Sequence, residues 1–198
     1  MSLKKALLWV FIVLLIDQIS KIYIKTNFLL GEEIYVFDWF RIRFIENEGM
    51  AWGVKLPGDY GKLALTLFRI IAVGGILYWL NESIKKNSPK LLIFAISLVL
   101  AGALGNIIDS VFYGVIFSDS TPYQLAETFS ANPYGTWFHG KVVDMLYFPI
   151  WEGKLPTWLP FWGGQDFLFF NAIFNIADSA ITVGVALMIF FNKRLFND

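Results

Sequence analysis

The chain has 198 residues, of which 57% are hydrophobic and 18% are aromatic, and its formal net charge at pH 7 is zero. Soluble globular domains are roughly 45–50% apolar, so this composition favours a small polytopic membrane protein, and the lack of a basic excess argues against nucleic acid as a partner. The chain has no cysteine and a single histidine, His139, which excludes disulfides, thiolate metal sites and a cysteine nucleophile and disfavours a Ser-His-Asp triad.

Four apolar segments are long enough to cross a bilayer core of about 30 Å, which needs about 20 helical residues. They cover residues 5–23, 62–80, 91–112 and 167–191. The first has the weakest pattern, because Asp17 and Gln18 interrupt it after eleven apolar residues, 6–16. A Lys4-Lys5 pair precedes this run as in a signal peptide, but no small-residue cleavage motif follows, so we expect a retained span.

The basic residues beside these spans gather on one side of the predicted membrane. They precede the first span, separate the second from the third, and follow the fourth: Lys4, Lys5, Lys85, Lys86, Lys90, Lys193 and Arg194. Short cytoplasmic connections are enriched in Lys and Arg. We therefore expect both termini in the cytoplasm and the long connections 25–61 and 114–166 on the outer side.

The two outer connections differ in character. The first contains a β-rich stretch at about 30–55, where aromatic and β-branched residues partly alternate, as in FRIRF at 40–44. The second is rich in Gly, Pro, Trp and Tyr and is too long for an idle turn, so we expect it to be ordered against the membrane surface.

Polar residues recur in the last predicted span at spacings of four, three and four: Asn171, Asn175, Asp178 and Thr182. On a continuous helix these positions form one stripe. Asp178 has no Lys or Arg within two turns. A carboxylate in hydrocarbon costs a few kcal/mol, and one without a local partner is a candidate functional residue.

Other polar residues admit plainer interpretations. Asn106 and Asp109 are three apart at the end of the third span and share a face, as expected of a site. Asn106 and Asn175 would equally serve as hydrogen-bonding groups between helices, and Asp109 would equally serve as a helix-terminal group. Asp17 and Lys21 are four apart in the first span and are expected to form a structural ion pair.

Asp144 lies in the outer connection between apolar neighbours, in the stretch VVDM. Two carboxyl groups brought close together hold one proton between them, which supplies a base and an acid at the same pH. With Asp178 as its partner, Asp144 would permit hydrolysis of a peptide bond without a metal, His or Cys.

Five stretches resemble, in order, the motifs of the lipoprotein signal peptidase (signal peptidase II) family. They are DQISK (17–21), ENEGMAWG (46–53), GNIIDS (105–110), VVDM (142–145) and FNIADSAITVG (174–184). Each motif is short, but the ordered set extends over most of the chain and agrees with four spans whose ends lie inside.

The resemblance implies an all-α membrane protein of the bacterial inner membrane, with four transmembrane helices, a small extracytoplasmic β-cradle at 30–55 and an extended outer loop. It implies an aspartyl endopeptidase that removes the signal peptide of diacylglyceryl-modified prolipoproteins, before the lipidated cysteine. By motif the catalytic pair falls on Asp144 and Asp178. The family's polar positions around the pair and the substrate fall on Asn47, Asn106, Asp109 and Asn175, and its structural first motif on Asp17 and Lys21.

As partners we expect the lipidated precursor, membrane lipid and the cyclic peptide antibiotic globomycin as inhibitor, with a monomeric protein and no metal or other cofactor. Two departures from the family pattern stand out. Ser110 occupies the place of an Arg, so either another basic residue substitutes, with Arg41, Arg43, Lys141 and Lys154 as candidates, or the contact is lost. The stretches between Asp109 and Asp144 and between Asp144 and Asn175 are longer than usual.

Two other classes remain open from the residues alone. Membrane carboxylates also serve proton- or ion-coupled transporters, although four spans are few and no inverted repeat is evident. A metal-dependent lipid hydrolase would use Asp109, Asp144 and Asp178 as oxygen ligands.

Overall fold

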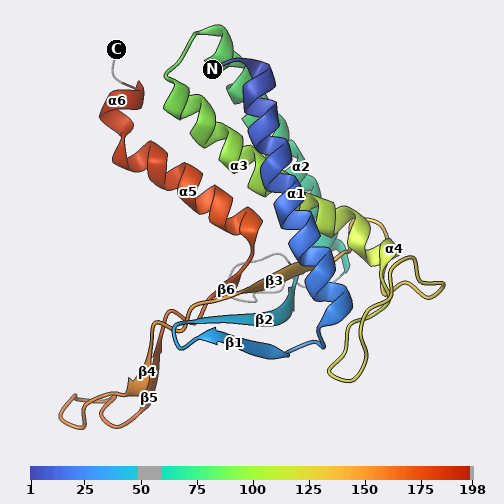
Figure 1. Ribbon diagram of the computed structural model, residues 1–198, viewed down its shortest axis with the longest axis vertical. Coiled ribbons are helices and arrows are strands. Elements are labelled where there is room, and N and C mark those ends of the chain that lie inside the picture. Colours follow the sequence, from blue (N-terminus) through green and yellow to red (C-terminus); the bar gives the residue numbers. More distant parts are fainter. Residues whose placement is uncertain (49–58, 197–198) are drawn as a thin grey trace.

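A computed structural model of the chain describes residues 1–48 and 59–196. The described residues form a bundle of helices: α1 (Leu3–Asn27), α2 (Asp59–Lys85), α3 (Lys90–Ile108) and α5 (Ile176–Phe190), with the short α6 (Asn192–Phe196) after α5. A π-helical turn, η2 (Asp109–Tyr113), and the short α4 (Gly114–Ile116) continue α3. A sheet crosses one end of the bundle, and both termini lie at the opposite end (Figure 1).

In the described part of the chain, two antiparallel sheets are made of six strands: β1 (Glu33–Phe37), β2 (Phe40–Asn47), β3 (Val142–Tyr147), β4 (Trp151–Lys154), β5 (Asp166–Phe169) and β6 (Ile173–Phe174). The larger sheet has the order β1-β2-β3-β6, and β4 and β5 form the second sheet. The fold is thus mostly helical with a small sheet region. Two of the sheet's strands fall within the predicted β-rich segment 30–55, of which residues 49–55 lie outside the described part of the chain.

Three helical segments of the described chain are long and apolar enough to cross a membrane, Leu3–Asn27, Tyr60–Lys85 and Lys90–Ile116. The prediction of a fourth continuous span over 167–191 is wrong. The helix there begins only at Ile176, because residues 166–169 pair with β4 and residues 173–174 pair with β3. Asn171 consequently lies exposed between two strands and is not part of a helical stripe.

Two glycines of α3 allow the first turn of α5 and helix α1 to approach closely. A Cβ on Gly102 would lie 2.2 Å from the backbone oxygen of Ala177, and one on Gly105 would lie 2.6 Å from an Asp17 oxygen. Neither space admits a side chain without moving the backbone or the carboxylate. These contacts place Asp17 of α1 and the first turn of α5 directly against α3.

A separate buried ion cluster ties the end of α1 to β2 and to the outer loop. Glu46, whose side chain is 3% exposed, pairs with Lys25 and with Lys141 at 3.0 Å, and accepts a hydrogen bond from Ser120 at 2.8 Å. Burial alone would raise the pKa of the Glu46 carboxyl, but Lys25 and then Lys141 outweigh it and lower the pKa. A depressed carboxyl pKa stabilises the fold above the unfolded-state pKa, and this contribution is lost as the pH falls through the folded-state pKa.

Glu46→Gln should therefore lower the free energy of unfolding by about 3 kcal/mol at neutral pH, because it leaves buried Lys25 without its counterion. The measurement is thermal unfolding of the purified protein in detergent at pH 7 and in acid, where the difference from wild type should shrink. Glu82→Gln is the matched control, since Glu82 pairs with the mostly exposed Lys85. Equal stability of Glu46→Gln and wild type at pH 7 would contradict this account.

Candidate active site

The first turn of α5 is closed by reciprocal capping between Asn175 and Asp178. The Asn175 side chain accepts a hydrogen bond from the Asp178 backbone N–H at 2.8 Å, and the Asp178 carboxylate accepts one from the Asn175 N–H at 3.4 Å. This capping box is the reason why the helix begins here. It also fixes the Asp178 side chain at the helix N-terminus, where a negative charge is favoured.

Asp144 reaches the same place from the middle of β3. Its side chain is buried, with 1% of the residue exposed. The Asn47 amide on neighbouring β2 donates to Asp144 Oδ2 at 3.2 Å, and the Asn175 amide donates to Oδ1 at 2.7 Å. Asn47 comes within range because β2 and β3 pair with Asn47 opposite Val142.

Asn106 of α3 completes a chain of amides between the two carboxyl groups. Its Nδ2 donates to Asp178 Oδ1 at 2.7 Å, and its Oδ1 accepts from Asn175 Nδ2 at 3.1 Å. Asn175 therefore contacts Asp144, Asp178 and Asn106 at once. We refer to Asp144 and Asp178 as the aspartate pair.

The aspartate pair is asymmetric in its surroundings. Asp144 is buried, whereas Asp178 is half-buried. Burial, and then the negative charge of Asp178, raise the pKa of the Asp144 carboxyl to about 7, against the opposing effects of Asn47, Lys21 and Asn175. Near neutral pH the site can hold one proton on Asp144.

A buried ionic network supports the pair from the α1 side. Lys21 lies 3.0 Å from Asp17, as the four-residue spacing predicts, and 2.9 Å from Asp109. Asp17 accepts the backbone N–H of Ala177 at 2.9 Å, and Asp109 accepts that of Val143 at 3.2 Å. Each of these acids thus holds the residue immediately before one member of the aspartate pair.

Asp109 also accepts a hydrogen bond from Gln18 at 2.9 Å. Its two oxygens are therefore engaged by Lys21, Gln18 and Val143, which places Asp109 in the supporting network. This arrangement differs from the three-carboxylate ligand set considered for a metal-dependent hydrolase.

The basic residue nearest to Ser110 was missed by the sequence reasoning. Arg69 of α2 donates from Nη1 to Ser110 Oγ at 3.5 Å, and its charge interacts with Asp178, Asp109 and Asp144. A usable signal existed, because Arg69 is the single charged residue between Lys62 and Glu82 in an otherwise apolar span.

The basic residues proposed to substitute at this position lie elsewhere. Arg41 and Arg43 contact Glu33 at 3.0 and 3.5 Å, and Lys141 contacts Glu46. Lys154 lies on β4, outside the larger sheet.

The sequence profile of the signal peptidase II family matches residues 9–193. The chain belongs to this family. The lipoprotein signal peptidase of Porphyromonas gingivalis (strain W83) is 50% identical over 180 residues, covering 90% of this chain and 78% of that protein. The lipoprotein signal peptidase of Amoebophilus asiaticus is 39% identical over 181 residues, covering 88% and 71%.

Two solved structures of bacterial membrane enzymes resemble this fold. A bacterial membrane enzyme determined at 1.9 Å by the in meso method aligns with a TM-score of 0.65 and 27% identity, over 99% of this chain and 95% of that one. Another at 2.3 Å aligns with a TM-score of 0.64 and 28% identity, over 97% and 89%. The family profile and the relatives confirm the resemblance to signal peptidase II that five short motifs predicted. The chain is therefore a member of a membrane protease family that processes prolipoproteins.

Proposed function

We propose that this signal peptidase II is an aspartyl endopeptidase that cleaves diacylglyceryl-modified prolipoproteins before the lipidated cysteine, with Asp144 and Asp178 as its catalytic residues. One observation supports this most directly: Asn175 contacts both carboxyl residues. Its side-chain amide donates to Asp144 at 2.7 Å, its backbone N–H donates to the Asp178 carboxylate, and its side-chain oxygen accepts the Asp178 backbone N–H. A shared amide keeps two carboxyl groups from separate elements at one place, as a shared proton requires.

The asymmetry of the pair suggests which aspartate is the general base and which is the general acid. Asp178, half-buried at a helix N-terminus where a negative charge is favoured, is the base, and Asp144, whose pKa is raised to about 7, is the acid. Asp178 takes a proton from water as the water oxygen bonds to the scissile carbonyl carbon, and Asp144 protonates the carbonyl oxygen. The tetrahedral diol then breaks its C–N bond, the proton on Asp178 passes to the leaving nitrogen, and Asp144 recovers its proton from a diol hydroxyl.

Asn47, Asn106 and Asn175 hold the carboxyl oxygens of the pair, and Asp109 holds β3 beside Asp144. Arg69 acts as a positioning residue, because its positive charge interacts with both members of the pair. Asp17 and Lys21 are structural. No metal or other cofactor takes part in this mechanism.

The proposed location is the bacterial inner membrane, with both termini cytoplasmic and the aspartate pair toward the outer side. Two observations support this orientation: the basic residues flank the terminal ends of the helices, and the termini lie at the end opposite the sheet (Figure 1). The helices also expose apolar side chains such as Phe11, Ile71 and Ile189, which suit contact with lipid. A lipidated substrate would enter laterally from the bilayer, and the enzyme would act as a monomer.

The deciding experiment incubates the purified protein with a diacylglyceryl-modified prolipoprotein and follows the product by mass spectrometry. We expect a product that begins at the lipidated cysteine, no cleavage of the unmodified precursor, and inhibition by globomycin. Cleavage should persist in EDTA. An activity abolished by EDTA and restored by magnesium would overturn the metal-free mechanism.

The rate should depend on pH through the aspartate pair. A raised carboxyl pKa means that Asp144 keeps its proton to a higher pH than usual, so kcat/KM should fall above about pH 7 as this acid is lost. In the described part of the chain the charged groups around the pair are Asp17, Lys21, Arg69 and Asp109. Arg69→Gln removes a cation that stabilises the carboxylate form of Asp144, so the fall in kcat/KM should shift to higher pH.

Arg43→Gln is the matched control for this shift, because Arg43 contacts Glu33 on β1. Arg69→Lys, which keeps the charge, should restore most of the wild-type profile. An unchanged profile in Arg69→Gln would remove Arg69 from its assigned role without affecting the aspartate pair itself.

A further inference from the structure

The β4–β5 hairpin and its connection, residues 151–169, form an arm separate from the larger sheet. We call this segment the aromatic arm and residues 155–165 its tip. The tip contains no charged residue. Its largest side chains face solvent in the isolated chain: Trp158 is 78% exposed, Phe161 is 91% exposed and Trp162 is 60% exposed.

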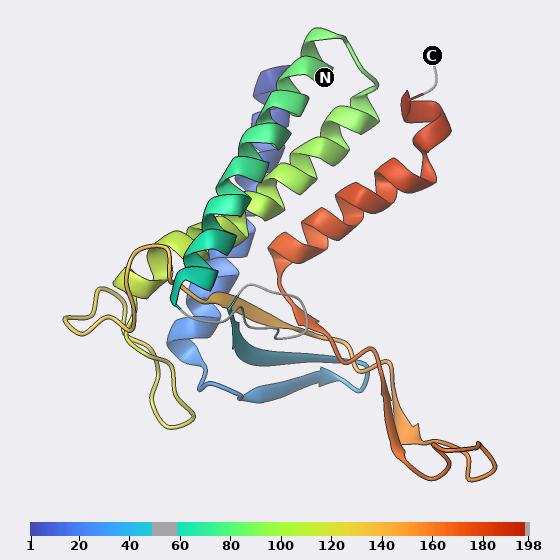
Figure 2. The same ribbon diagram turned by 180° about the vertical axis from the view of Figure 1, so that it is seen from behind.

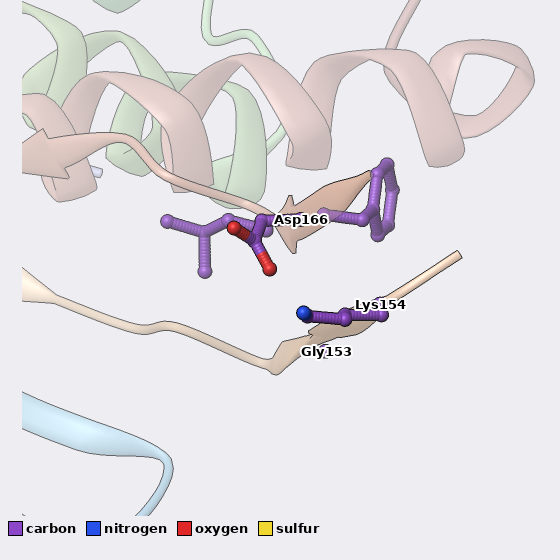
Figure 3. A pocket seen from close by; sticks show the side chains of 5 residues that line it. Gly153, Lys154 and Asp166 are labelled. Carbon is purple, nitrogen blue, oxygen red and sulfur yellow. The ribbon is translucent and has the colours of Figure 1, made fainter. Parts of the chain in front are cut away.

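The charged residues of the arm, Glu152, Lys154 and Asp166, all belong to its two strands. Lys154 and Asp166 lie opposite each other where β4 ends and β5 begins, and together with Gly153, Phe167 and Leu168 they line a hollow there (Figure 3). The tip between these two residues is uncharged, so the boundary between polar and apolar surface falls at its base.

The arm leaves the sheet on the side of α5, pointing away from the other helices in both views (Figure 1 and Figure 2). After β5, the chain passes through β6 directly into the Asn175 cap of α5. The base of the arm is therefore close to the level at which this apolar helix begins. The loops between α4 and β3 lie at the other end of the sheet, and their exposed residues include Tyr123, which is 94% exposed.

We infer that the tip of the aromatic arm inserts into the interfacial region of the outer leaflet and binds the lipid surface. Trp and other aromatic residues concentrate at the membrane–water boundary. Burying each large apolar side chain contributes a favourable free energy, whereas leaving three of them in water has no compensating contact. A bilayer suits this surface better than a protein partner does, because the tip offers no charged side chain for specific pairing and belongs to a chain already embedded in lipid.

This inference requires the bilayer orientation proposed above but not proteolytic activity, so it can be tested without a cleavage assay. The chain contains no cysteine, which permits a single label at a chosen site. Phe161→Cys carries the fluorophore NBD in the protein reconstituted into nanodiscs of phosphatidylcholine and phosphatidylglycerol, one copy per disc. We expect blue-shifted NBD emission, efficient quenching by lipids with a nitroxide near the headgroup, and weak quenching by aqueous iodide.

Tyr123→Cys with the same label is the matched control, because Tyr123 is equally exposed and lies between the charged residues Asp119 and Glu127 at the other end of the sheet. Iodide should quench this label several-fold more strongly than the label at position 161. Equal iodide quenching at the two positions would overturn the inference. So would a blue shift that appears only when two copies share a disc, because the tip would then be covered by a second copy. A label at Trp158→Cys should repeat the result of Phe161→Cys.

Discussion

Replacing either Asp144 or Asp178 with asparagine is expected to stop cleavage of a lipidated prolipoprotein while the protein still folds. Asparagine has the size of aspartate but can neither take a proton from water nor donate one to the substrate. General acid–base catalysis contributes about 10²–10⁴-fold to a rate. A variant that lacks one member of a shared-proton pair should lose at least that much of kcat, with a smaller change in KM.

The two variants should differ slightly in stability. Each Asp144 oxygen accepts an amide N–H, from Asn47 or from Asn175, so the NH₂ group of Asp144→Asn faces a donor and loses one hydrogen bond, at about 1 kcal/mol. Asp178 is half-buried, and an asparagine there keeps an oxygen for the 2.7 Å hydrogen bond from Asn106 and gives up only the long 3.4 Å bond from the Asn175 N–H. Asp178→Asn should therefore unfold at nearly the wild-type temperature.

The measurements are product mass for activity and thermal unfolding in detergent for the fold. Asp166→Asn is the matched control, since Asp166 is exposed on the aromatic arm and should cleave at the wild-type rate. Normal turnover by either Asp144→Asn or Asp178→Asn would remove the catalytic assignment even though the family assignment would stand.

The sequence was informative wherever the relevant property is local. Two such properties are the lack of a basic residue near Asp178 in an apolar run and the spacing of Asp17 and Lys21. The order of the five motifs is likewise visible in the sequence itself. The start of the last helix was not predictable in this way. Phe167 to Phe174 is as apolar as the helix that follows, and hydrophobicity without a clear period does not distinguish a strand from a buried helix.

Contacts between distant elements could not be predicted from spacing. Asn47 meets Asp144 only because of the register between β2 and β3, and Arg69 meets Ser110 only because α2 packs against α3. The roles of such residues depend on packing angles and strand register that no local pattern specifies. The capping box at Asn175 was detectable in principle. A polar residue inside an apolar segment long enough to span a membrane is, however, more readily interpreted as part of a polar helix face than as the start of a helix.

Lys21→Met should strongly lower the free energy of unfolding. Its ammonium group is completely buried between Asp17 and Asp109, and it also donates to Asn106 at 3.0 Å. Removing one partner of a buried ion pair costs about 3–5 kcal/mol, because the remaining charge is left without compensation. For a chain of this size the midpoint of thermal unfolding should fall on the order of 10 °C.

The same change should impair cleavage, because Lys21 joins the two acids that hold the backbone before each member of the aspartate pair. Lys85→Met is the matched control: Lys85 also pairs with an acid at 3.0 Å, but 63% of its side chain is exposed, and such pairs contribute little. Adding Asp17→Asn to Lys21→Met removes one of the two buried carboxylates that have lost their counterion. The amide oxygen of the new asparagine can still accept the Ala177 N–H, so part of the lost stability should return. If Lys21→Met unfolds like the wild type, or Asp17→Asn restores nothing, the network does not hold the site in the way that its geometry indicates.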